Sequence, residues 1–114
     1  MELKSRTVQK NVILELTGRF DAYNAPTVDQ WFEKLDATAT ENIVVNLNGV
    51  EFIDSTALAL LVRGMKRARQ SDNDLVLCGL QGPVQTIITL TRLDKAFNIY
   101  EDEEAALKAL TMGE

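Results

Sequence analysis

The strongest constraint on this chain is the alternation of short, β-branched apolar runs with stretches that have helical spacing. The runs at 3–8 and 12–17 predict an opening hairpin, in which Gly18 ends the second strand with a turn. The runs at 43–47, 75–78 and 97–100 predict three more strands, each preceded by a helical stretch. Strands separated by single helices are joined most simply by right-handed crossovers. The pattern therefore predicts an α/β fold with a mixed, mainly parallel sheet of about five strands and about four helices.

Four stretches repeat apolar residues at three- and four-residue steps, which is the spacing of an amphipathic helix. The first follows Asn24 as N-cap, with Pro26 in its first turn, and the second begins at Ser55 behind Asp54 and ends near Ser71. The third follows Pro83, and the fourth begins among the carboxylates of 101–104. Between strand 43–47 and the second helix, Asn48-Gly49 predicts a turn. The predicted inner faces are Val28, Trp31, Phe32, Leu35 and Ala39; Leu58, Leu61, Val62, Met65 and Ala68; Val84, Ile87, Ile88 and Thr91; and Ala106, Leu107 and Leu110.

Composition limits the chemistry that the chain is expected to perform. With 114 residues, residues 1–114 are expected to form one domain. The absence of histidine excludes Ser-His-Asp catalysis and removes the commonest metal ligand, so we expect neither a cofactor nor a metal. A formal charge of −5 argues against direct binding to nucleic acid or anionic lipid. The N-terminus lacks the apolar region of a secretory signal, no apolar run is long enough for membrane insertion, and the single cysteine fits the cytoplasm.

Several conspicuous side chains have a structural explanation. At least one of Trp31 and Phe32 is expected in the core, and Cys78 lies in an apolar run as a small buried hydrophobe. The basic residues of the second helix either solvate its outer face and offset its dipole, which we favour, or form a patch for an acidic partner; they are Arg63, Lys66, Arg67 and Arg69. No exposed apolar face is evident, so the free protein is expected to be a monomer.

The segment 50–61 is the main candidate for function. Ligands of parallel α/β sheets usually bind at the carboxyl ends of the strands, and Asp54, Ser55 and Thr56 follow such a strand. If Asp54 is the N-cap, the Ser55 hydroxyl lies near backbone N–H groups that lack helical acceptors. A phosphate on Ser55 would be stabilised by those backbone donors and destabilised by repulsion from the Asp54 carboxylate. From residue types alone, the three residues either cap a helix or form a switch.

Three segments together resemble the STAS domain, specifically the bacterial anti-sigma factor antagonist family. They are Gly18-Arg19-Phe20-Asp21 with Ala25-Pro26, Asn46-Leu47 with 50–56, and Leu93-Asp94-Lys95-Ala96-Phe97. The resemblance spans essentially the whole chain, and the joint spacing of the segments is more specific than any one of them.

The resemblance implies a partner switch. Ser55 matches the serine that a cognate kinase phosphorylates, and Thr56 is the neighbouring hydroxyl. Asp21 and Asp54 match acidic positions that shape the loop and contact the kinase. The unphosphorylated domain would bind an anti-sigma factor that is also a serine kinase, setting a sigma factor free, and a metal-dependent serine phosphatase would restore this form. The family usually has glycine where this chain has Ala57, whose methyl group either narrows partner choice or stiffens the first turn.

Three other functions are weaker interpretations of the same residues. An auxiliary STAS subunit of a lipid-transport ABC system would share the fold without needing phosphorylation. A small hydrolase would use Asp21 and Asp54 as paired carboxylates, but the chain has no phosphate-binding glycine loop. A response regulator would need an acidic pair after its first strand, which residues 3–10 do not supply. We therefore expect a regulatory binding module and not an enzyme.

Overall fold

The strands form one twisted sheet in which four neighbours run parallel. The computed structural model describes residues 1–36 and 41–112. Within them the sheet order is β1-β2-β3-β4-β5, with β1 antiparallel to β2 and every other pair parallel. The predicted mixed, mainly parallel sheet is confirmed. The strands are β1 (Glu2–Val8), β2 (Asn11–Phe20), β3 (Asn42–Ile53), β4 (Leu75–Cys78) and β5 (Ile99–Tyr100).

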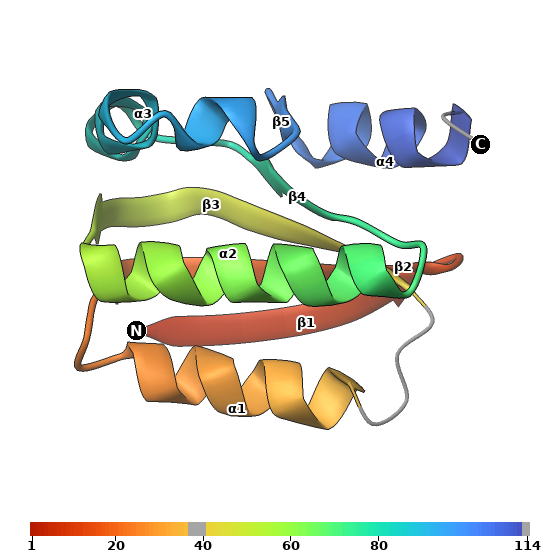
Figure 1. Ribbon diagram of the computed structural model, residues 1–114, viewed down its shortest axis with the longest axis horizontal. Coiled ribbons are helices and arrows are strands. Elements are labelled where there is room, and N and C mark those ends of the chain that lie inside the picture. The colour runs from red at the N-terminus through yellow and green to blue at the C-terminus, as the bar shows by residue number, and fades with distance from the viewer. Residues whose placement is uncertain (37–40, 113–114) are drawn as a thin grey trace.

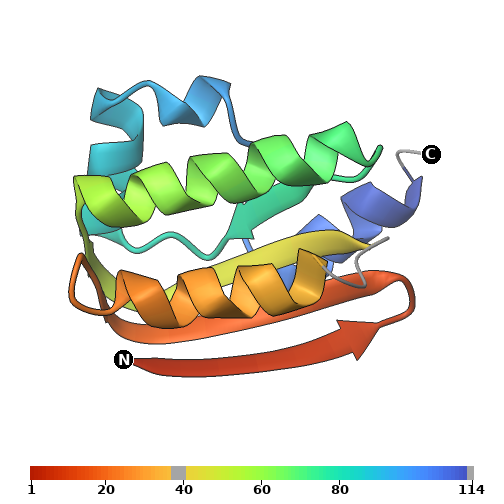
Figure 2. The same cartoon turned by 60° about the horizontal axis from the view of Figure 1, so that its bottom comes forward.

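Helices cover both faces of this sheet (Figure 1). The large core on one face joins the sheet to the apolar sides of α1, α2 and α3, whereas Ala106 of α4 packs on the other face against Ile13, Val44 and Val76. Figure 2 shows α2 lying between α1 and α3 on their shared face. Among the described residues no helix is long and apolar enough to cross a bilayer. The helices are α1 (Ala25–Asp36), α2 (Ser55–Gln70), α3 (Gly82–Leu90) and α4 (Glu103–Met112), with a short 3-10 helix at Leu93–Lys95.

Most predicted helix faces are confirmed. Phe32 is buried and Trp31 is half-buried, in edge-to-face contact at 5.3 Å. The inner face of α2 is buried as expected, with Val62 and Ala68 packed against the core. Thr91, predicted to continue the inner face of α3, is instead exposed as its C-cap. Ala39 lies outside the described residues.

Two predicted strand ends were wrong, and both involve glycine. β2 continues past Gly18 to Phe20; this glycine has φ +112° beside a register irregularity, so it bends the strand without ending it. β3 likewise runs through Asn48-Gly49, where a turn was expected. A Cβ at Gly49 would lie 2.8 Å from Thr17 Oγ1 and 3.0 Å from the Leu16 carbonyl oxygen. The glycine therefore serves a close approach of β2, which the dipeptide alone does not distinguish from a turn.

The last strand is shorter than predicted. The N–H groups of Ala96 and Phe97 donate to the Leu93 carbonyl oxygen at 3.0 and 2.9 Å. Because of this local helical bonding, the last strand, β5, begins only at Ile99. Residues 97 and 98 therefore do not belong to a strand. Phe97 is nevertheless buried in the core.

Candidate functional site

The candidate site lies where β2 and β3 end side by side. Phe20 and Ile53 are paired in the parallel register, and the Asp54 N–H donates to the Phe20 carbonyl oxygen at 3.3 Å. Asp21 directly follows β2, and Asp54 directly follows β3. Helices α1 and α2 begin at this same edge of the sheet (Figure 1). Parallel pairing thus brings together two aspartates that are 33 positions apart in the sequence.

Asp54 joins the two loops through its carboxylate. It is the N-cap of α2 with an extended backbone, and its Oδ1 accepts a hydrogen bond from the Ala57 N–H at 3.0 Å. Its Oδ2 accepts from the Ala22 N–H, in the loop before α1, at 2.9 Å. The predicted capping role is confirmed, and the second bond adds a link between segments distant in sequence.

Asp21 organises its own turn. Its Oδ1 accepts from the Asn24 N–H at 3.1 Å, and its carbonyl oxygen accepts from the Ala25 N–H at 2.7 Å. Its Oδ2 forms an ion pair with Arg19 Nε at 3.4 Å. Arg19 also places its guanidinium carbon 4.0 Å from the centre of the Phe52 ring, a cation–π geometry. Both aspartates therefore hold the loops in a fixed shape.

Ser55 and Thr56 project from this fixed support. Both are exposed in the first turn of α2, whereas Ala57 is completely buried. In the described part of the chain, the N–H groups of Ser55 and Thr56 donate to no protein acceptor. The arrangement presents a hydroxyl and two free backbone donors at the positive end of a 16-residue helix.

Tyr23 was missed by the sequence reasoning. It lies one residue after Ala22 in the loop bound by Asp54, and 89% of its surface is exposed. Large aromatic side chains are over-represented among the residues that anchor protein interfaces. The only signal in the sequence is an aromatic residue between Ala22 and Asn24, inside the turn that Asp21 organises.

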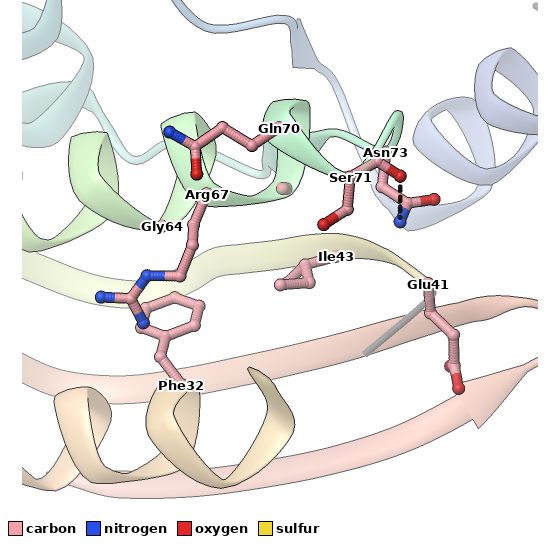
Figure 3. A pocket seen from close by; sticks show the side chains of 9 residues that line it. Phe32, Glu41, Ile43, Gly64, Arg67, Gln70, Ser71 and Asn73 are labelled. Atoms are coloured by element: carbon pink, nitrogen blue, oxygen red, sulfur yellow. Dashed lines mark hydrogen bonds between the residues drawn. The ribbon is translucent and has the colours of Figure 1, made fainter. Parts of the chain in front are cut away.

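A pocket of about 190 Å³ lies elsewhere, between α1 and the second half of α2. Figure 3 shows Phe32 and Arg67 at one end and Ser71 and Asn73 at the other, with the Asn73 side-chain amide donating to the Ser71 carbonyl oxygen at 3.2 Å. Ser55 does not line this pocket. The candidate site is thus an exposed surface and not this cavity.

The remaining candidate for chemistry is Cys78, which is completely buried under α4. Burial, and then the nearby carboxylates of Glu103 and Asp102, raise the pKa of its thiol to about 12. A thiol in this state is a poor nucleophile at neutral pH. Within residues 1–36 and 41–112, no three acidic or cysteine side chains are grouped so that they could hold a metal ion.

Comparison with known proteins identifies the family of this chain. The family model described as the STAS domain matches residues 2–106. The chain belongs to the STAS domain family.

Named relatives of this STAS domain are antagonists of anti-sigma factors. The anti-sigma-B factor antagonist of Staphylococcus aureus is 26% identical over 104 residues, covering 91% of this chain and 96% of that protein. The anti-sigma F factor antagonist of Paenibacillus polymyxa is 28% identical over 100 residues, covering 87% and 86%. A Thermotoga maritima protein assigned as an anti-sigma factor antagonist has a crystal structure that superposes with a TM-score of 0.91 at 25% identity, covering 96% and 94%.

In this STAS domain, the structure limits what Ala57 can do in place of the glycine that the family usually has. The Ala57 side chain is 0% exposed and belongs to the main core, while its N–H is held by Asp54. Its methyl group therefore cannot contact a partner directly. Of the two effects considered from the sequence, the geometry favours the local one, a stiffer first turn of α2.

Proposed function

We propose that this STAS domain is an anti-sigma factor antagonist controlled by phosphorylation of Ser55. Its unphosphorylated form binds an anti-sigma factor that is also a serine kinase, and a sigma factor is thereby freed. Phosphorylation ends the binding, and a metal-dependent serine phosphatase restores the active form. The domain works in the cytoplasm as a monomer when free and performs no catalysis of its own. The named relatives support the antagonist role.

The observation that carries the proposal is the position of Ser55. Its side chain is exposed, and the preceding residue, Asp54, already has both carboxylate oxygens bonded to backbone N–H groups. A kinase therefore reaches the hydroxyl without opening the fold. Asp54 is a poor general base for a hydrolase in this arrangement, because its oxygens are held in structural hydrogen bonds.

The same position explains how a phosphate would end binding. Phosphoserine adds about −1.5 to −2 charges at neutral pH. The charge would lie beside the Asp54 carboxylate at the centre of a surface that also includes Asp21 and Thr56. A partner that fits the neutral serine between these two carboxylates would then have to desolvate a dianion as well, in a region that is already negative.

The first experiment is peptide mass spectrometry of the protein isolated from its own cells, both growing and stressed. We expect phosphate on Ser55 that varies with conditions, its loss in Ser55→Ala, and its persistence in Thr56→Ala as the matched control. When the unphosphorylated form is purified, a protein with serine kinase activity should co-purify with it. Absence of phosphate at Ser55 under every condition would refute the switch and favour the lipid-transport subunit instead.

A further inference from the structure

The charge of α2 is opposite to that of the rest of the chain. All its charged residues are basic, and it contains no carboxylate; they are Arg63, Lys66, Arg67 and Arg69. The remainder of the chain has eight basic residues against 17 acidic ones. An acidic protein thus carries one positive helix, and Ser55 is the first residue of that helix.

Part of this positive charge faces outward along one line. Exposed residues recur at alternating three- and four-residue steps, which places them on one side of the helix. We call this line the outer stripe; its members are Thr56, Ala59, Arg63, Lys66 and Gln70. The opposite side of α2 is buried in the core, and α1 and α3 flank the helix (Figure 2).

Structural needs account for the basic residues at the end of α2 but not for those on the outer stripe. Arg67 and Arg69 lie in the last turn, where cations offset the helix dipole, and Arg69 also bonds to Asp74 Oδ1 at 2.9 Å. Arg63 and Lys66 lie before that turn, beyond the main reach of the dipole effect. Among the described residues, neither of them forms an ion pair.

The outer stripe is close enough to Ser55 to share a partner. At a rise of about 1.5 Å per residue, Arg63 lies about 12 Å and Lys66 about 16 Å along the helix from Ser55. A protein interface of standard size covers about 800 Å² on each partner, equivalent to a disc of about 16 Å radius. A partner centred on Ser55 therefore extends over Arg63 and reaches Lys66.

We propose that Arg63 and Lys66 dock an acidic patch on the same protein that binds at Ser55. This inference rests on the proposed function, because it assumes that a partner covers the Ser55 end of α2. The partner would meet carboxylates at the Asp21 and Asp54 end and cations farther along the helix. This arrangement of negative charge at one end and positive charge along the helix fixes the orientation of the partner and speeds its association. A nucleic acid is disfavoured as the occupant, since the rest of the chain would repel it.

The test first identifies the partner and then measures the contribution of the stripe. A photo-crosslinking side chain at position 56, in the native cells, should join the domain to one protein, identified by peptide mass spectrometry. With that purified protein as the probe, R63E/K66E should lower affinity at least about tenfold at low salt, and R63Q/K66Q should lower it less. High salt should remove most of the difference, since screening is stronger there.

The matched control is K10E/K108E, which makes the same charge change at two exposed lysines, one in the β1–β2 turn and one on α4. It should stay within about twofold of the wild type. If R63E/K66E behaves like this control while position 56 still crosslinks, the docking proposal is refuted and the proposed function stands. If position 56 crosslinks to no protein, the proposed function loses its interface and the docking proposal falls with it. Circular dichroism of each variant checks that the fold is retained.

Discussion

Replacing Asp54 by alanine should loosen both loops of the site at once. The substitution removes the N-cap bond to Ala57, worth about 1 kcal/mol. It also removes the bond from Ala22, which adds about 1 kcal/mol, the value of an ordinary hydrogen bond, because the partial exposure of Asp54 weakens the gain from its charge. The expected loss in the free energy of unfolding is therefore about 2 kcal/mol, or about 8 °C in Tm at about 4 °C per kcal/mol. Asp54→Asn keeps only one acceptor oxygen and should lose about 1 kcal/mol.

Urea unfolding followed by Trp31 fluorescence and by circular dichroism measures both variants. The control is Glu33→Ala, which removes an exposed carboxylate of α1 and should change stability by less than about 0.5 kcal/mol. Equal m values across the set would show that the comparison concerns the folded state. If Asp54→Ala lowers the free energy of unfolding no more than Glu33→Ala does, the Asp54 carboxylate does not hold the loops together. Its role would then be contact with a partner.

Two other predictions concern buried side chains. Ala57→Gly should lower stability by about 1 to 2 kcal/mol, through helix propensity and a lost buried methyl group, and leave partner affinity unchanged; a large affinity change at unaltered stability, by titration and urea unfolding, would contradict this. For Cys78, burial raises the pKa of the folded thiol from 9.0 to about 12, so its contribution is complete below pH 9 and is lost as the pH rises toward 12. Between pH 8 and 10 the wild type should lose about 1.4 kcal/mol more than Cys78→Ala. Equal losses in paired urea titrations would show that the thiol does not titrate differently on folding.

The fold was predictable because local pattern and tertiary structure agree over most of the chain. β-branched runs became strands, and helical spacing placed α2 at its observed start, behind an aspartate that caps it. The two wrong strand ends at Gly18 and Gly49 arose because tertiary contacts, not the local sequence, explain these glycines. Gly49 is required because β2 passes within contact distance, a fact that no local window contains. Gly18 bends a strand whose pairing with β3 continues to Phe20.

The site was predictable only in part, because its geometry depends on contacts between distant segments. The Asp54 cap is local, three residues from its donor, and the sequence indicated it. The bond from Ala22 to Asp54 spans 32 positions and exists only because β2 and β3 pair in parallel. The exposure of Tyr23 follows from the same loop packing. Spacing identified the positive side of α2, but whether Arg63 and Lys66 form ion pairs depends on the neighbouring elements, and they form none within residues 1–36 and 41–112.

These contacts determine how a phosphate on Ser55 would act under the proposed function. Asp54 already occupies the Ala57 N–H and fixes the loop before α1, so the modified side chain has no structural bond to displace. The N–H groups of Ser55 and Thr56, which have no acceptor in the described part of the chain, would offset part of the new charge within the domain itself. Stability should therefore change little, and the added charge would act mainly on the bound state. A loss of about 3 kcal/mol there reduces affinity more than a hundredfold. A rigid site of this kind lets one covalent change alter what the surface binds while the fold that presents it stays the same.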